Sequence, residues 1–568
     1  MYRTKRSKPR GKKGFFILCL TALVAIIAGF SFLLAYISSY KFGTGPINAV
    51  SPSPGTSGIA PTATPSSIAD ASAIPKENLP SAFGFKYELM RGNKALDNFK
   101  AETDLAFGKP EEYSQVAGVT GFRGNNYRNS PSYGYAEVKE QKLEKVWFAK
   151  TGYIDGWTGV GWTGQPSIIK WDESVRKVMN IQSDKKQKKD LKEIIYATLD
   201  GKIYFLDLED GKPTRNPIDT GFPHKGSVAV DPRGYPLLYA GQGINSNGNK
   251  YGDIGHRIFS LIDQKLLYFL NGIDSFAYRQ WGAFDGNPLI NKATDTLLLS
   301  GENGLFYNIK LNTRFDPSKG TVSVSPDIVK MRHKNTRSGT QGSENSVAVY
   351  KNYAYFADNS GMLYCMDTNT MKPVWMRSVT DDTDSTVVID EVSSSEVYLY
   401  TGCEVDIQGV GGSSYVRKIN ALTGELVWEK SYPCVLNKDV SGGVLATPVV
   451  GKNEIKDMVI FNIAKTKDTP NSMGGKLVAY DKKTGKEIWT MTLQNYGWSS
   501  PVDIYTKEGK AYIILCDSLG NMMLIDPLKG SVLNKINLEA NVEGSPAVYD
   551  NMIVVGTRGQ KIWGIRIK

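Results

Sequence analysis

Cysteine is scarce in this chain, with 5 residues among 568, and no two of them are adjacent. Lone thiols of this kind are usually buried core residues rather than reactive groups. Cys403 and Cys434 fall within one predicted structural unit and could pair in an oxidising compartment, but the sequence does not supply the distance between them. The pairing of these two residues therefore stays open.

Histidine is rarer still, with 3 residues. Their spacing matches no zinc motif, and we interpret His224, His256 and His333 as loop residues. The sequence also lacks a Ser/His/Asp set, a phosphate-binding loop and a dinucleotide fingerprint. It offers no sign of the enzyme classes that depend on these motifs.

Helical periodicity is nearly absent after residue 110. In its place the chain has 57 Gly, 30 Tyr, 21 Phe and 10 Trp, which suit short strands and tight turns. The chain is longer than one ordinary domain, yet all-β folds of repeated sheets run as one large unit. These features predict one large all-β domain with appendages.

Positive charge is concentrated at the N-terminus. Of the net charge of +11, seven basic residues lie within residues 1–13, which contain no acid and so leave only +4 for the rest of the chain. That remainder is too small for a polyanion-binding surface, which argues against nucleic acid as a partner.

Residues 14–37 carry no charge. As a helix they would span about 36 Å, enough for a bilayer core of roughly 30 Å. With the basic tail before them, they predict an uncleaved, single-pass signal anchor in the cell membrane, the rest of the chain being extracytoplasmic. The alternative is a cleavable signal peptide, but no clean small-residue cleavage site follows.

Two segments separate this anchor from the main domain. Residues 38–75 are rich in Pro, Ser, Thr and Ala and predict a disordered linker. Residues 76–142 are expected to form a strap on the outside of the domain, with a short helix within residues 94–107.

A repeated hairpin organises the remainder. In residues 477–493, LVAYDKKTGKEIWTMTL, two apolar strands flank a turn that Asp or Asn opens, with Gly four residues later and Trp eight residues later. The acid can accept turn N–H groups, Gly can take a positive φ, and Trp would lie flat between neighbouring sheets. The copies are Asp481, Gly485 and Trp489; Asn420, Gly424 and Trp428; and Asp367 and Trp375, with Met371 in the Gly position.

Weaker copies without Trp begin at Asp207 and Asp526. From Asp367 onward the openers are 53, 61 and 45 residues apart, the period of a four-stranded propeller blade with its loops. This pattern resembles the PQQ-like (quinoprotein-like, pyrroloquinoline quinone repeat) β-propeller family over residues 120–568. Residues 121–134 also resemble the segment that precedes the first blade in that family and would pack across one end of the propeller.

The sequence predicts eight blades, although seven stay possible because the second and third lack the repeat motif. The last blade would be a composite of residues 143–150 with residues 545–549, 552–557 and 561–567, which would remove open sheet edges. The insert at residues 172–193 is expected to be a solvated hairpin tip. The other seven blades are assigned to residues 166–218, 226–270, 286–324, 345–379, 386–431, 443–493 and 500–538, within a propeller of residues 143–568.

The segments that lead into each innermost strand should converge on one mouth of the channel. Their aromatic, carboxylate and amide side chains could bind a sugar, a peptide or a planar ring; alternatively, they only plug the channel and cap strand ends. The candidate ligand-binding residues are Trp157, Trp162, Arg279, Trp281, Asp285, Glu344, Asn345, Asp384, Asp439, Trp498 and Glu543.

The family resemblance implies a choice of functions. PQQ-dependent dehydrogenases of the family need calcium, an Asp base and, in many members, a disulfide between adjacent cysteines, whereas this chain has no adjacent pair. Glu344 and Asn345 keep a carboxylate beside an amide, but no convincing calcium ligand set is evident. We therefore expect a non-catalytic binding or scaffold module for an envelope protein or glycan, without cofactor or metal. The alternative is a PQQ- and calcium-dependent dehydrogenase; a third reading is an assembly scaffold similar to the propeller lipoprotein of outer-membrane barrel insertion.

Overall fold

The computed structural model describes residues 73–162, 164–248, 250–437 and 440–568. The predicted tail (1–13), signal anchor (14–37) and nearly all of the linker (38–75) lie outside these ranges, as does Asp439. Among the described residues, no helix is both long and apolar enough to cross a bilayer.

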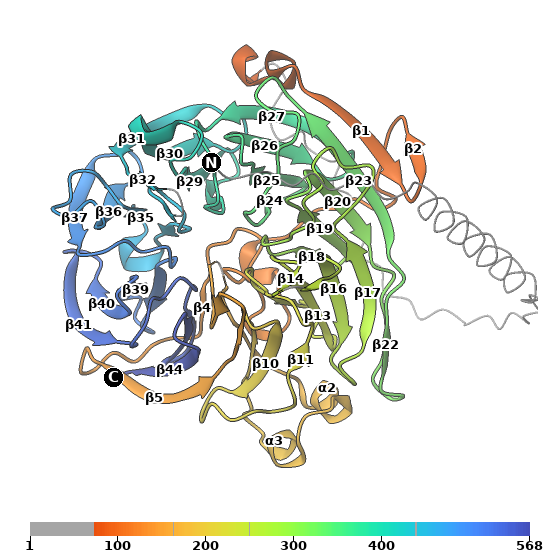
Figure 1. Ribbon diagram of the computed structural model, residues 1–568, viewed down its shortest axis with the longest axis vertical. Coiled ribbons are helices and arrows are strands. Elements are labelled where there is room, and N and C mark those ends of the chain that lie inside the picture. Colours follow the sequence, from red (N-terminus) through yellow and green to blue (C-terminus); the bar gives the residue numbers. More distant parts are fainter. Residues whose placement is uncertain (1–72, 163, 249, 438–439) are drawn as a thin grey trace, which may run out of the picture. The chain divides into compact units, whose positions relative to one another are not determined.

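Eight antiparallel sheets form a ring of blades (Figure 1). The first four blades, from the innermost to the outermost strand, are β8 (Ser167–Lys170), β9 (Glu193–Ala197), β10 (Lys202–Asp207) and β11 (Ile218–Asp219); β12 (Ala229–Val230), β13 (Leu237–Gly241), β16 (Gly255–Ser260) and β17 (Leu266–Asn271); β18 (Leu289–Asn291), β19 (Thr296–Ser300), β20 (Leu305–Lys310) and β23 (Asp327–Lys334); and β24 (Ala348–Tyr350), β25 (Tyr353–Ala357), β26 (Met362–Asp367) and β27 (Lys372–Ser378).

The other four complete the ring. They are β28 (Val388–Ser393), β29 (Glu396–Gly402), β30 (Ser413–Asn420) and β31 (Leu426–Pro433); β34 (Val449–Val450), β35 (Met458–Ala464), β36 (Gly475–Asp481) and β37 (Glu487–Leu493); β38 (Val502–Tyr505), β39 (Ala511–Cys516), β40 (Asn521–Asp526) and β41 (Ser531–Asn537); and β42 (Ala547–Tyr549), β43 (Met552–Thr557), β44 (Lys561–Ile567) and β5 (Leu143–Lys150).

The composite eighth blade confirms the predicted closure: β5, from the N-terminal side, pairs antiparallel with β44, from the C-terminus. Blades two and three form without the repeat motif, which settles the count at eight. Burial on both faces explains why the middle strands read as apolar runs, as in β36, where residues 477–480 are all buried against neighbouring blades.

Four strands extend the blades. β1 (Lys86–Arg91) and β2 (Lys94–Leu96) continue blade three outward, because β1 pairs with the outer strand β23. β3 (Ala117–Val119) and β4 (Ser132–Tyr133) lie at the inner edges of blades one and eight. The expected helix within residues 94–107 is wrong, since this stretch holds β2 followed by irregular backbone.

Several other expectations need correction. Blade three ends at Lys334, not at residue 324, because β21 (Arg314–Asp316) and β22 (Thr321–Ser323) form a side hairpin before the true outer strand. His256 and His333 are buried strand residues in β16 and β23; only His224 lies in a loop. The buried thiols Cys403 and Cys434 are both free.

The insert of blade one is not a solvated tip. It forms α2 (Glu173–Val178) and α3 (Ser183–Gln187), and its apolar residues Met179 and Leu191 join the core shared by blades one and two. Three short hairpins complete the strands: β6 (Tyr153–Ile154) with β7 (Trp157–Thr158), β14 (Ser246–Asn247) with β15 (Lys250–Tyr251), and β32 (Leu436–Asn437) with β33 (Val440–Ser441). The 3-10 helices are η2 (Lys76–Asn78), η3 (Pro80–Phe83), η4 (Pro110–Glu112), η5 (Gly409–Gly411) and η6 (Asn453–Ile455).

The segment between β3 and β4 ties the inner strands together at the centre of the ring (Figure 1, orange). Arg123 donates to the carbonyl oxygens of Pro448 and Pro501, each at 2.9 Å, and Arg128 donates to those of Val347 and Asn287 at 2.8 and 2.7 Å. Both guanidinium groups are buried. Four blades therefore share one buried hydrogen-bonded hub.

Candidate functional site: an acidic and aromatic mouth

Two sets of loops meet at one end of the ring. In each blade the innermost strand starts at this end and the second strand returns to it, because the strands are antiparallel. The connections between blades and the hairpins between second and third strands therefore share one mouth. Asp384 belongs to the first set, and Glu302 and Glu404 belong to the second.

A cavity of about 790 Å³ opens at this mouth. That volume is within the range of small-molecule and peptide-side-chain sites. Its lining combines aromatic rings with acidic groups and two basic ones: Trp157, Gly161, Trp162, Leu199, Lys225, Glu344, Asp384, Glu404, Asp406, Val410, Leu436, Ser441, Leu445, Tyr496, Trp498, Glu543 and Arg558.

Six of the eleven predicted site residues line the cavity: Trp157, Trp162, Glu344, Asp384, Trp498 and Glu543. Asp285 and Arg279 do not line the cavity; Asp285 pairs with the lining residue Lys225, and Arg279 pairs with Glu302. Trp281 does not line the cavity. Asn345 is a structural residue, because its amide donates to the carbonyl oxygens of Ala357 and Thr383.

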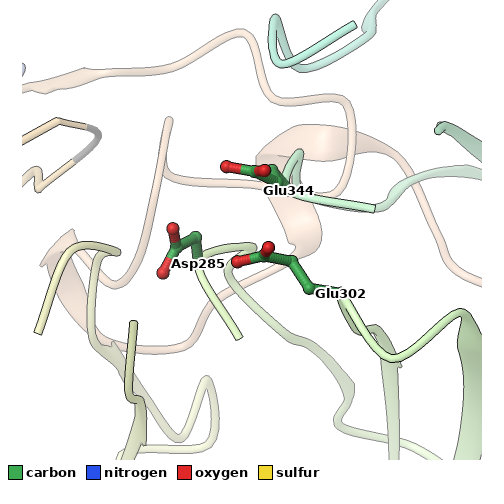
Figure 2. Close-up of side chains that lie close together, drawn as sticks. All are labelled: Asp285, Glu302 and Glu344. Carbon is green, nitrogen blue, oxygen red and sulfur yellow. The ribbon is translucent and has the colours of Figure 1, made fainter. Parts of the chain in front are cut away.

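A first group of carboxylates, Asp285, Glu302 and Glu344, gathers at blades three and four (Figure 2). One oxygen of each lies within 4.8 Å of the others. Burial and the neighbouring carboxylates hold the pKa of Glu302 well above its usual range, and burial also raises that of Glu344.

Two cations compensate this first group in part. Lys225 Nζ lies 2.7 Å from Asp285 and 3.8 Å from Glu344, and Arg279 lies 3.7 Å from Glu302. Burial opposes the charge on Lys225, but the adjacent carboxylates outweigh it and raise the pKa of this lysine. The group thus carries its own counter-charges.

A second group, Asp382, Asp384 and Glu404, lies at blade five, again with one oxygen of each within 4.8 Å of the others. Burial, together with repulsion from neighbouring carboxylates that include Glu344, raises the pKa of all three carboxyl groups well above the usual range. No lysine or arginine within the described ranges forms an ion pair with them.

Another part of the lining is aromatic. The rings of Tyr496 and Trp498 lie 5.4 Å apart at 50°, and the buried indole N–H of Trp498 has no hydrogen-bond partner. Glu543 is held by Arg558 at 3.0 Å and by Asn541 at 2.8 Å. This part of the lining therefore offers flat apolar faces and a donor without a partner.

Sequence reasoning missed Lys225, Glu302, Asp382, Glu404, Asp406 and Arg558. Lys225 and Asp382 were in loops assigned to the mouth but were not singled out. The other four lie in hairpins between second and third strands. Strand polarity was the available signal, since an antiparallel blade directs those hairpins to the same end as the connections between blades.

The geometry can be compared with known proteins. Residues 313–464 and 473–568, somewhat under half of the chain, match the PQQ_2 family model, described as outer membrane protein assembly factor BamB. No curated protein matches the chain.

Two solved structures are among those similar to this chain. The quinohemoprotein alcohol dehydrogenase ADHIIG from Pseudomonas putida HK5 is 12% identical, with 82% of this chain and 83% of that chain covered and a TM-score of 0.52. BamB from Moraxella catarrhalis is also 12% identical, with 75% and 98% covered, but its TM-score of 0.33 is too low to carry an argument. At such identities the likeness to the dehydrogenase shows the fold alone. The chain is therefore similar to the PQQ_2 family over residues 313–464 and 473–568, and its fold is similar to that of the dehydrogenase.

Proposed function

We propose that this chain is a non-catalytic binding module whose mouth holds a positively charged segment of a partner protein of the cell envelope. The observation that carries the proposal is the lining of the cavity. Glu344, Asp384, Glu404 and Asp406 form one wall, and Trp157, Trp162, Tyr496 and Trp498 supply aromatic faces.

Such a lining matches a lysine or arginine side chain. The cation can rest over an aromatic face while carboxylates accept its N–H groups, and each contact strengthens as water is excluded. The two basic residues of the lining are already engaged, Lys225 by Asp285 and Arg558 by Glu543. Burial raises the pKa of Glu344, Asp384 and Glu404, and a bound cation would favour their ionised form.

The same lining fits a quinone cofactor poorly. Pyrroloquinoline quinone carries three carboxylate groups, and its site would need basic partners, whereas the lysine and arginine of this cavity are already paired with acids. A quinoprotein dehydrogenase is therefore the weaker candidate.

The comparisons favour a protein partner. The matching family is described as an outer membrane protein assembly factor, and propellers commonly serve as rigid scaffolds on which loops carry the specificity. We further propose that residues 14–37 anchor the module in the membrane with the propeller outside the cytoplasm. Alkaline carbonate extraction checks this: the full chain should stay in the membrane pellet, and a variant lacking residues 14–37 should not.

The binding proposal is tested by titrating the full-length chain with pentapeptides that differ only in a central Lys or Glu, while tryptophan fluorescence is recorded. The Lys peptide should bind, more weakly as salt rises, and the Glu peptide should not. Asp406→Asn and Trp498→Phe should each weaken binding several-fold. Glu140→Gln, on the exposed outer surface, is the matched control and should bind as the native chain does.

Equal binding of both peptides, or none, would overturn the proposal. Thermal unfolding with pyrroloquinoline quinone plus Ca²⁺, against Ca²⁺ alone, tests the alternative. A ligand at 100 times its Kd adds about 2.7 kcal/mol to stability, so a rise that needs the quinone would restore the dehydrogenase reading.

A further inference from the structure

The second carboxylate group is built by two loops that hold each other. Asp382 and Asp384 lie between β27 and β28, and Glu404 follows β29. The Glu404 N–H donates to the carbonyl oxygen of Asp382 at 2.9 Å, and Glu404 also forms a β-bridge with Gly443. The backbone therefore fixes the three carboxylates close together.

The neighbouring Asp381 shows how an acid is satisfied in this region. Its carboxylate accepts the backbone N–H groups of Asp406, Ile407 and Gln408 and the side-chain amide of Gln408, at 2.8 to 3.1 Å. This acid holds the loop that carries Glu404 and needs no further partner. Asp381 is therefore the reference for the three acids of the second group.

Asp382 and Asp384 have no such donors. The Oδ1 atom of each is buried without a hydrogen-bond partner, and Asp384 is 8% exposed. The first group, by contrast, has Lys225 and Arg279 beside it. Buried carboxylates without donors or counter-ions are costly, because both desolvation and mutual repulsion oppose their ionised form.

We propose that Asp382, Asp384 and Glu404 bind a divalent cation of the class that prefers oxygen ligands, with Ca²⁺ as its reference member. Asp384 and Glu404 line the cavity, so the ion can enter from the mouth and keep water on its open side. One oxygen of each acid lies within 4.8 Å of the others, a spacing that ligands at about 2.3–2.6 Å from a calcium ion can span.

This site shares Asp384 and Glu404 with the acidic wall proposed for the partner segment, but its test needs neither a peptide nor a cofactor. The bound ion would give the second group the counter-charge that Lys225 and Arg279 give the first. It would also cross-link the blade connection that carries Asp384 to the hairpin that carries Glu404, and so stiffen one wall of the mouth.

The test uses the full-length chain freed of metal by a chelator. Isothermal titration with CaCl₂, MgCl₂ and MnCl₂, and thermal unfolding with each salt, measure binding and stabilisation. One ion should bind per chain and raise the unfolding midpoint. Glu404→Gln should weaken Ca²⁺ binding at least tenfold, whereas Glu302→Gln, the same change in the compensated group, should leave it unchanged.

Unfolding midpoints without metal show whether each variant folds; Asp384→Asn serves as a second variant and should lose Ca²⁺ binding in the same way. The proposal would be overturned if none of the three cations bound the native chain. It would also be overturned if Glu404→Gln and Asp384→Asn bound Ca²⁺ as the native chain does, or if Glu302→Gln alone lost binding, which would place the ion at the first group.

Discussion

Trp428 of blade five lies directly against Gly485 of blade six. A Cβ atom on Gly485 would be 2.7 Å from the Trp428 Cγ atom, and the indole N–H of Trp428 donates at 3.1 Å to the carbonyl oxygen of Lys482, three residues before the glycine. Equivalent pairs join Trp375 to Gly424, Trp489 to Gly530 and Trp147 to Gly211. The repeat motif therefore provides a packing contact between successive blades: the Trp of one copy packs against the Gly of the copy in the next blade.

This contact predicts that Gly485→Ala destabilises the protein for two reasons. Gly485 has a φ of 66°, which costs a non-glycine residue about 1 kcal/mol, and its methyl group would displace the indole, at a further cost of about 1–3 kcal/mol. Chemical denaturation followed by tryptophan fluorescence measures the loss. Gly92→Ala, at a φ of 56° with no atom within 4 Å of the added Cβ, should show the backbone cost alone. Equal losses in both variants would contradict the contact.

The buried hydrogen bonds of Arg123 predict that its replacement costs more stability than Gly485→Ala does. Arg123→Met would remove the donors to the carbonyl oxygens of Arg128, Pro448 and Pro501, leaving buried acceptors unpaired, and should cost about 3–5 kcal/mol. The midpoint of denaturation measures this. Arg566→Met, whose exposed guanidinium lies 4.0 Å from Glu144, should change stability by no more than about 0.5 kcal/mol. A near-neutral Arg123→Met variant would show that the hub is not a structural tie.

The burial of apolar residues in the insert of blade one predicts that the insert contributes to the stability of the core. Met179→Ala should cost about 2–5 kcal/mol, because Met179 is 1% exposed within the core of blades one and two. Lys177→Ala in α2, whose ammonium meets only the exposed Glu173, should change stability by at most about 0.5 kcal/mol. Equal and small losses of stability in both variants would indicate that the insert is a solvated tip, as the sequence suggested.

His333 makes stability depend on pH. Burial lowers the pKa of His333 from 6.5 to about 4, and neither ring nitrogen has a hydrogen-bond partner. The unfolded chain therefore takes up this proton first as pH falls, so folding stability should decline between pH 6.5 and 4. His333→Phe should remove about 1.4 kcal/mol per pH unit of that decline and keep the ring packed against Phe85 and Tyr364.

The measurement is the unfolding free energy of both chains from pH 7 to pH 4. His224→Phe is the contrast, because the His224 ring lies 2.8 Å from Thr220 Oγ1 and 2.6 Å from the Gly241 carbonyl oxygen; it should lose stability already at pH 7. An unchanged pH slope in His333→Phe would show that His333 does not titrate with unfolding.

The sequence by itself determined the repeat and its closure. The spacing of Asp481, Gly485 and Trp489, and the apolar strands at both ends of the domain, were enough to predict an eight-bladed ring, because turn chemistry and strand alternation are local properties. Local pattern failed where a long hairpin interrupts a blade, as before β23, and where partners are distant, as for His333 and Met179, whose burial depends on neighbouring segments.

Only the tertiary structure decided which charged residues meet. Asp384 and Glu404 are 20 residues apart, and Lys225 pairs with Asp285 from the next connection, because the ring brings loops of successive blades to one axis. Whether a carboxylate receives donors, as Asp381 does, or is left with none, as Asp384 is, depends on how those loops pack. Composition and spacing contain no record of that packing, since a hydrogen bond depends on distance in space rather than on order along the chain.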